Sequence, residues 1–191
     1  MIGDVCDAAA ARYSPHRRGE HVLRDDEDVD ALLQGSLTMR HTCDKNAVLA
    51  AIGCDRRIGS MCLRPGYGFG GPCFPRDNRA FATTATDLGI EPLLPRATDA
   101  CNTAHAHAQV ELLVAARQPQ YTFRDVAYKP QCPTPLIEES QKLRVASLLA
   151  ARLSRDLVPA PRITIADRAT VLREVRLAYG RRFTYLETSR E

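Results

Sequence analysis

The sequence lacks the features that mark several large classes of protein. Neither charge is in strong excess, since 26 Lys and Arg residues against 23 Asp and Glu residues give a formal net charge of +3. With 45% hydrophobic residues, this balance excludes a disordered charged tail and gives no compositional reason to expect nucleic-acid binding. No run approaches the roughly 20 apolar residues that a membrane helix needs. We therefore expect a soluble, globular chain that binds neither membranes nor nucleic acids.

Signals for export, for a regular disulfide framework and for a metal site are also lacking. The residues after Met1 do not form a basic segment followed by an apolar run, as a secretory signal would. The seven cysteines are odd in number and irregularly spaced, and no C-x-x-C motif occurs. His105 and His107 are two apart on a predicted helix, so they point to different faces and are poor joint metal ligands. We expect a cytoplasmic protein without a metal site.

The first part of the chain predicts helices and a charged insertion. Residues 1–41 combine a short helical piece, which resembles the end of a longer helix, with a breaker-rich and charged stretch that we interpret as a flexible insertion. Residues 42–118 predict a helical segment that ends where the composition changes at Gln118. Its expected helices run from the N-cap candidate Asp44 to Gly53, from Asp77 or Asn78 to Gly89, and from Ala100 to Ala116.

The second part of the chain, residues 119–191, alternates between strand and helix patterns. The expected strands are 121–128, 163–166 and 183–186, and the expected helices are 138–153 and 169–179. The order βαβαβ favours a small parallel sheet with right-handed crossovers. The sequence therefore predicts an α/β protein in which a helical central segment precedes a small parallel-sheet domain.

The most unusual stretch lies inside the helical segment. Seven of the eleven residues from Pro65 to Pro75 are Gly or Pro, so the backbone there must form a loop. The glycines would let a bulky substrate approach Cys73. A helix N-terminus and Arg76 nearby would favour the nucleophilic thiolate. A tight turn that happens to contain a buried cysteine explains the same spacing about equally well.

Two motifs in this order resemble one known family. The first is Asp55-Arg56-Arg57-Ile58-Gly59 followed by the loop through Asp77, and the second is Val126-Ala127-Tyr128-Lys129-Pro130 followed by Glu138-Glu139-Ser140. Both are similar to segments of the UDP-glucose/GDP-mannose dehydrogenases, over about residues 42–167. The resemblance implies that the helical segment is the central, dimerising part of such an enzyme. The sheet domain would then be similar to the family's UDP-binding domain.

The resemblance also implies a reaction and residues for it. The family oxidises C6 of a nucleotide sugar from alcohol to carboxylate with NAD. Cys73 would capture the aldehyde as a thiohemiacetal, and loss of a hydride would give a thioester that water cleaves. Asp77 would assist the water or a proton transfer, and it is also a plain helix-cap candidate. The positions that would bind the substrate are Arg57, Tyr67, Gly68, Phe69, Gly70, Gly71, Phe74 and Lys129.

The match to the family has two departures. The family begins with a Rossmann domain that carries G-x-G-x-x-G, and no such pattern precedes Asp44, so the main NAD site is not expected in this chain. Glu138 stands where the family has an arginine. We therefore expect part of a nucleotide-sugar 6-dehydrogenase that needs a separate Rossmann-bearing chain, and Arg57 predicts a homodimer because the family's arginine reaches a neighbouring subunit. A non-catalytic nucleotide-sugar-binding or dimerising module and a redox-sensitive thiol remain as alternatives.

Overall fold

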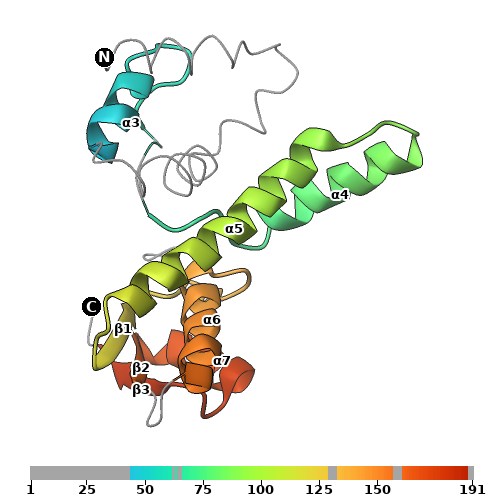
Figure 1. The fold of residues 1–191 in the computed structure, drawn as a ribbon. Coiled ribbons are helices and arrows are strands. Elements are labelled where there is room, and N and C mark those ends of the chain that lie inside the picture. Colours follow the sequence, from blue (N-terminus) through green and yellow to red (C-terminus); the bar gives the residue numbers. More distant parts are fainter. Residues whose placement is uncertain (1–43, 62, 64–65, 129–132, 157–160, 189–191) are drawn as a thin grey trace. The chain divides into compact units, whose positions relative to one another are not determined.

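The computed structural model describes most of the chain after the first 43 residues. The described residues are 44–61, 63, 66–128, 133–156 and 161–188. They form helices and strands in the order α3, α4, α5, β1, α6, β2, α7, β3 (Figure 1). The α/β class predicted from the sequence is confirmed, whereas the expected helical remnant and insertion over residues 1–41 lie outside the described residues.

The chain divides into two compact units. The helical unit consists of Asn78–His105 with the described part of Met1–Phe69, and the sheet unit consists of Gly70–Asp77 with Ala106–Glu191. The loop that contains Cys73 is therefore divided between Phe69 and Gly70, and its second half belongs to the sheet unit. The domain boundary expected at Gln118 stays a prediction.

The first described helix begins and ends where the sequence predicts. Helix α3 spans Lys45–Gly53. The side chain of Asp44 accepts a hydrogen bond from the backbone N–H of Asn46, at 2.9 Å. This is the N-cap interaction that short polar side chains provide, and it satisfies one amide that the helix itself cannot.

The next two helices begin earlier than predicted. Helix α4 spans Phe74–Asp87 rather than beginning at Asp77 or Asn78, and helix α5 spans Leu93–Ala115 rather than beginning at Ala100. The reason is the position of the prolines. Pro75 and Pro95 lie in the first turns, where a missing N–H costs no helical hydrogen bond and the fixed φ suits a helix. Helix α4 ends just before Gly89, whose φ of +72° fits the predicted stop.

The predicted βαβαβ arrangement is confirmed. The elements are β1 Gln120–Arg124, α6 Gln141–Asp156, β2 Arg162–Asp167, α7 Ala169–Tyr179 and β3 Thr184–Glu187. The strands lie side by side in the order β1-β2-β3, and both pairs are parallel. In the register, Phe123 lies opposite Ile165, which in turn lies opposite Tyr185. Helix α7 has the predicted bounds, and Gly180 follows it.

Strand β1 ends four residues before its predicted end because the backbone amides that follow it donate to a carboxylate instead of to the neighbouring strand. Asp125 has a φ of +53°, which turns the chain out of the strand. The next two amides, of Val126 and Ala127, donate to Oδ2 of Asp167 at 2.7 and 3.3 Å. Helix α6 likewise begins at Gln141 rather than at Glu138. Its N-cap is Ser140, whose Oγ accepts from the third helical amide at 3.4 Å.

The core of the sheet unit is made of aliphatic side chains from α6, α7 and β2. At most 1% of each is exposed: Leu143, Val145, Leu149, Ile165, Val171, Leu172 and Val175. Burying one such side chain contributes about 1.5–3 kcal/mol, so this cluster accounts for why the short sheet holds together. Within the described residues, no helix is both long and apolar enough to cross a membrane.

We expect the carboxylate of Asp167 to be a main support of the sheet unit. Asp167 is buried, and Asp167→Ala leaves two buried amides without an acceptor, which should lower the free energy of unfolding by about 2–4 kcal/mol. Urea denaturation followed by circular dichroism measures this change. Glu187→Ala removes an exposed carboxylate from the neighbouring strand end and should change stability by less than about 0.5 kcal/mol. Equal losses in the two variants would contradict the prediction.

Candidate functional site

The first half of the Gly-Pro-rich loop is held by polar side chains of α5. The amide Nδ2 of Asn102 donates to the carbonyl of Phe69 at 2.9 Å. The ring nitrogen Nε2 of His105 lies 3.0 Å from the carbonyl oxygen of Gly66. A Cβ on Gly68 would overlap the Asn102 amide, whose Cγ would be 3.1 Å away. Glycine is required at position 68 because the side chain of Asn102 fills the space that a Cβ would occupy.

Asn102 and His105 are the site residues that sequence reasoning missed. Only 1% of Asn102 and 3% of His105 is exposed, and Asn102 Oδ1 and His105 Nδ1 have no hydrogen-bond partner among the described residues. The available signal was two polar residues three apart, hence on one helix face, in an alanine-rich helix. His107 is exposed, which confirms that the two histidines point to different faces. No group of three or more potential metal ligands occurs in the described part of the chain.

The second half of the loop is packed against the sheet unit. Gly70 and Gly71 are buried. A Cβ on Gly70 would overlap the carbonyl oxygen of Glu139, and a Cβ on Gly71 would overlap the ring of Tyr128. Gly71 also has a φ of +82°, which residues with a side chain rarely adopt. These glycines thus permit close packing within the chain, a reason different from the substrate access that the sequence suggested.

Cys73 is exposed and lies directly before the first residue of α4. Its carbonyl accepts the N–H of Asp77 at 2.8 Å, so the thiol-bearing residue is joined to the first turn of the helix. The exposure of this residue contradicts the alternative of a buried cysteine in a tight turn. A catalytic role for Cys73 stays a prediction.

Asp77 lies in the first turn of α4, beside the cysteine. Its Oδ1 accepts from Nε of Arg76 at 2.8 Å, and 63% of its side chain is exposed. This hydrogen bond raises the pKa of Arg76 above its ordinary value. A negative charge in the first helical turn is favourable, so Asp77 supports the helix from within rather than capping it. Its assistance to a proton transfer stays a prediction.

The other predicted substrate-binding residues have different environments. Phe69 is 2% exposed and belongs to the core, whereas Phe74 is 41% exposed. Burial raises the pKa of Tyr67, so its phenol is neutral at physiological pH. Lys129 lies outside the described residues. The substrate-binding roles assigned to these four residues and to the glycines stay predictions.

Arg57, in the helical unit, pairs with Asp55. Its Nη2 lies 2.6 Å from Oδ2 of Asp55, and its Nε donates to Oδ1 at 3.0 Å. The side-chain hydrogen bond from Arg57 is the main reason that the pKa of Asp55 falls from 3.8 to about 2. The pair is exposed, so a ligand anion that binds Arg57 must share it with this carboxylate.

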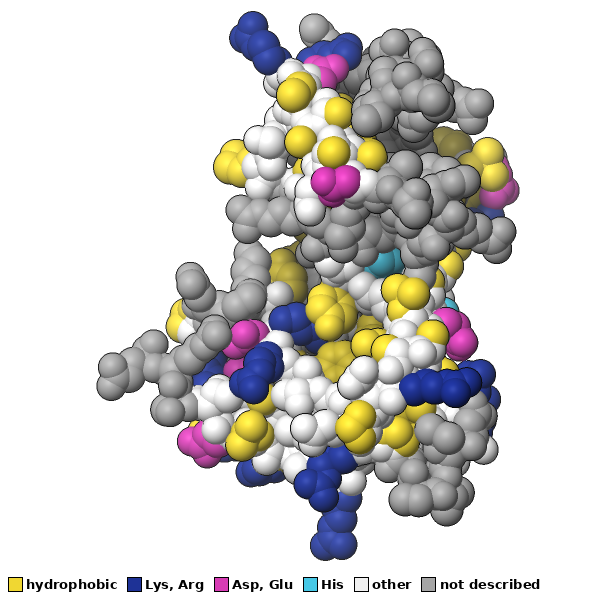
Figure 2. All heavy atoms as spheres, turned by 60° about the vertical axis from the view of Figure 1, so that its left-hand side comes forward, with side chains coloured by type: hydrophobic (Ala, Val, Ile, Leu, Met, Phe, Trp, Pro, Cys, Tyr) yellow, Lys and Arg dark blue, Asp and Glu magenta, His cyan; other side chains and the backbone are white. Residues whose placement is uncertain are grey.

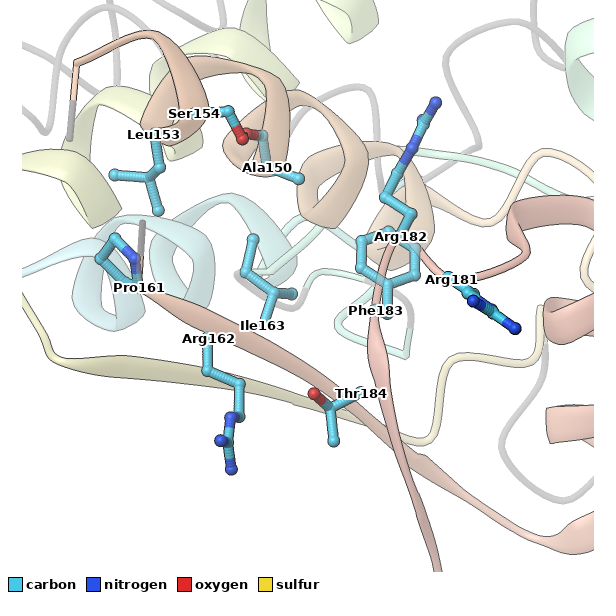
Figure 3. Close-up of a pocket in the computed structure, with 10 residues that line it drawn as sticks. All are labelled: Ala150, Leu153, Ser154, Pro161, Arg162, Ile163, Arg181, Arg182, Phe183 and Thr184. Atoms are coloured by element: carbon cyan, nitrogen blue, oxygen red, sulfur yellow. The ribbon is translucent and has the colours of Figure 1, made fainter. Parts of the chain in front are cut away.

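A surface hollow lies at the opposite ends of the strands from Asp167. Its volume is about 220 Å³, and it is lined by residues from the end of α6 and from the starts of β2 and β3. Figure 2 shows Lys and Arg side chains (dark blue) standing out from the sheet unit. In Figure 3, Arg162 and Arg182 extend in opposite directions, away from Ile163 and Phe183. Arginines that diverge do not form a joint anion site, and Cys73 does not line this hollow.

The fold and the loop define an α/β protein with an exposed thiol at the start of a helix, followed by a parallel βαβαβ unit. Residues 34–104 match the sequence model of the "UDP-glucose/GDP-mannose dehydrogenase family, central domain". UDP-glucose 6-dehydrogenase AglM of Haloferax volcanii is 41% identical over 70 residues, covering 37% of this chain and 16% of that protein. UDP-glucose 6-dehydrogenase of Pseudomonas aeruginosa is 34% identical over 84 residues, covering 44% of this chain and 18% of that protein.

The fold is also similar to that of a solved relative. A UDP-glucose dehydrogenase from Pyrobaculum islandicum superimposes with a TM-score of 0.72 at 29% identity, over 87% of this chain and 37% of that one. The chain is therefore similar to UDP-glucose/GDP-mannose dehydrogenases, in sequence over residues 34–104 and in fold over a longer stretch. It spans well under half of the length of the relatives that it matches.

Removing the Arg57 guanidinium should raise the pKa of Asp55 part of the way to its ordinary value. In Arg57→Ala, we expect this pKa to rise from about 2 toward 3.8 without reaching it, because the carboxylate loses the side-chain donors but keeps the backbone N–H of residue 57 at 2.9 Å. The folded-state pKa is depressed, so the pair contributes its stabilisation above pH 3.8 and loses it as the pH falls through about 2. NMR titration of the carboxyl carbon measures the pKa. Arg56→Ala, at the exposed neighbour, should leave it low. A pKa that stays near 2 in Arg57→Ala would show that the pair is not its cause.

Proposed function

We propose that this chain supplies the thiol-bearing loop and the nucleotide-binding sheet of a cytoplasmic nucleotide-sugar 6-dehydrogenase of the UDP-glucose type. The observation that carries the proposal is the exposed Cys73 at the start of α4, within the segment that matches the family. Asp77, one helical turn later, is the second catalytic residue in this proposal. A homodimer or a separate Rossmann-bearing chain would complete the enzyme.

The proposed chemistry at Cys73 consists of adding and releasing a carbonyl compound. The thiolate attacks the aldehyde carbon at C6 of the sugar, an S–C bond forms, and the carbonyl oxygen takes up a proton to give a thiohemiacetal. After C6 has been oxidised to a thioester, the oxygen of water bonds to that carbon and the S–C bond breaks. The sugar leaves as a carboxylate, and the sulfur returns as the thiolate. Asp77 would accept the proton of the attacking water.

The described residues of this chain do not fit NAD. A dinucleotide site needs glycines at the turn between a strand and the following helix, where the backbone approaches the pyrophosphate. The chain has no glycine between Gly89 and Gly180, so both strand-to-helix turns of the sheet lack them. The backbone amides that follow β1 already donate hydrogen bonds to the carboxylate of Asp167, so they cannot donate to a pyrophosphate. We therefore assign the oxidation steps, and the NAD that they require, to a Rossmann-bearing partner or region.

A non-catalytic nucleotide-sugar-binding module is the second candidate. It is favoured by Glu138, an exposed carboxylate at a position where the family carries an arginine. A carboxylate there repels phosphate rather than pairing with it. Calorimetric titration with UDP-glucose, UDP-glucuronate and GDP-mannose separates the candidates when combined with turnover measurements. Binding without turnover in the presence of a partner would favour the module.

We expect UDP-glucose to shield Cys73 from alkylation. At a concentration about ten times its Kd, the nucleotide sugar should slow modification of Cys73 roughly tenfold, because only the unoccupied fraction reacts. Cys54 is a second exposed thiol and should react at an unchanged rate, which provides an internal control. Mass spectrometry of the peptides measures both rates. Equal rates with and without UDP-glucose would contradict nucleotide-sugar binding at this loop.

A complementation assay tests catalysis. The chain is mixed with NAD, UDP-glucose and a Rossmann-bearing candidate, and NADH formation is measured. Cys73→Ser should abolish formation of the sugar acid, because the alcohol cannot serve as the same covalent handle, whereas Cys54→Ser should remain active. If no partner restores NADH formation that depends on Cys73, the enzymatic proposal fails.

A further inference from the structure

The segment that follows β1, residues 125–128, is hydrogen-bonded to the rest of the sheet unit through both its amides and its carbonyls. Two of its amides donate to the buried Asp167 carboxylate, as described above. The hydroxyl of Ser140 donates to the carbonyl of Val126 at 2.6 Å, and Ser140 is also the N-cap of α6. The next residue but one, Tyr128, donates its backbone N–H to the carbonyl of Leu136 at 2.8 Å. Tyr128 therefore belongs to a short segment in which each of residues 126, 127 and 128 makes a backbone hydrogen bond.

The ring of Tyr128 contacts the turn that leads to Cys73. A Cβ placed on Gly71 would overlap ring atoms Cδ2 and Cε2 and lie 2.6 Å from Cζ, so the ring covers this glycine directly. The preceding glycine, Gly70, is covered by the carbonyl of Glu139, which comes from the same edge of the sheet unit. Gly71 is two residues before the cysteine, with only the rigid Pro72 between them.

We propose that Tyr128 is a positioning residue for Cys73: its ring presses on Gly71 and holds the turn that presents the thiol at the start of α4. The inference rests on the proposed function, because that function requires the thiol of Cys73 to be held in one position. Loop residues that carry catalytic groups need support of this kind, because a misplacement of about 1 Å can cost about 100-fold in rate. The ring atoms make the contact, so phenylalanine should replace tyrosine at this position.

Hydrogen exchange tests the contact without any turnover. In the full chain, Tyr128→Ala should speed amide exchange at Gly70, Gly71 and Cys73 at least tenfold, a fold-change that marks a local opening. Tyr128→Phe should restore the wild-type rates. Tyr185→Ala removes a partly buried tyrosine from β3 of the same unit and should leave the three amides unchanged. If Tyr128→Ala does not fold, Tyr128→Leu takes its place. Unchanged exchange in the folded variant would overturn the proposal.

A double-mutant cycle tests whether the ring acts through Gly71. Gly71→Ala places a methyl group into the ring, so its effect on the unfolding equilibrium constant should be at least about fivefold smaller in the Tyr128→Ala background than in the wild type. The backbone strain at φ +82° is common to both backgrounds and cancels in the comparison. If the effects of Gly71→Ala and Tyr128→Ala on the unfolding equilibrium are additive, the contact between the ring and Gly71 does not position the turn, and the proposal is wrong.

The two proposals fail in distinguishable ways. With a partner that supports turnover, Tyr128→Ala should lower kcat while KM changes little, and Tyr128→Phe should retain activity. Loss of kcat in Tyr185→Ala as well would show a general structural effect and would overturn the positioning role. If exchange and the cycle give the expected results but UDP-glucose never shields Cys73, the proposed function fails and the anchoring of the turn stands.

Discussion

The carboxylate of Asp167 is the constraint on which the arrangement of the sheet unit depends. It is buried at the carboxyl end of the central strand and accepts two amides from the segment that follows β1. Without this acceptor, those amides would have to continue the ladder or reach water. Because the carboxylate takes them, β1 stops early and Tyr128 is carried to the turn before Cys73. A single buried side chain thus links the sheet to the loop with the candidate nucleophile.

The glycines of the loop follow from the same packing. Gly68 lies against the amide of Asn102, Gly70 against a carbonyl, and Gly71 against an aromatic ring. A loop filled so closely by its own chain is held in place rather than left open. For the proposed reaction, in which an S–C bond forms and breaks at one sulfur, a fixed thiol would be an advantage, since the geometry of attack would be set before a substrate arrives.

Much of this organisation was readable from residue patterns, and the failures have physical causes. Helix α7 and the Asp44 cap were predicted because local signals, an apolar stripe with Gly180 and a capping side chain, act over a few residues. Helices α4 and α5 begin earlier than predicted because Pro75 and Pro95 fit the first turns, where a proline loses no hydrogen bond. The end of β1 was placed too late because its acceptor lies about 40 residues away in the sequence.

The sequence by itself determined the resemblance to UDP-glucose/GDP-mannose dehydrogenases, the parallel βαβαβ order and the position of Cys73 before a helix, because these depend on composition, periodicity and motifs along the chain. Only the tertiary structure decided why the glycines are needed and which residues hold the loop. Asn102, Tyr128 and Glu139 reach those glycines from remote parts of the chain, and no local pattern records such contacts. Close packing is a property of surfaces brought together by folding, so it becomes visible only when the coordinates of both sides are known.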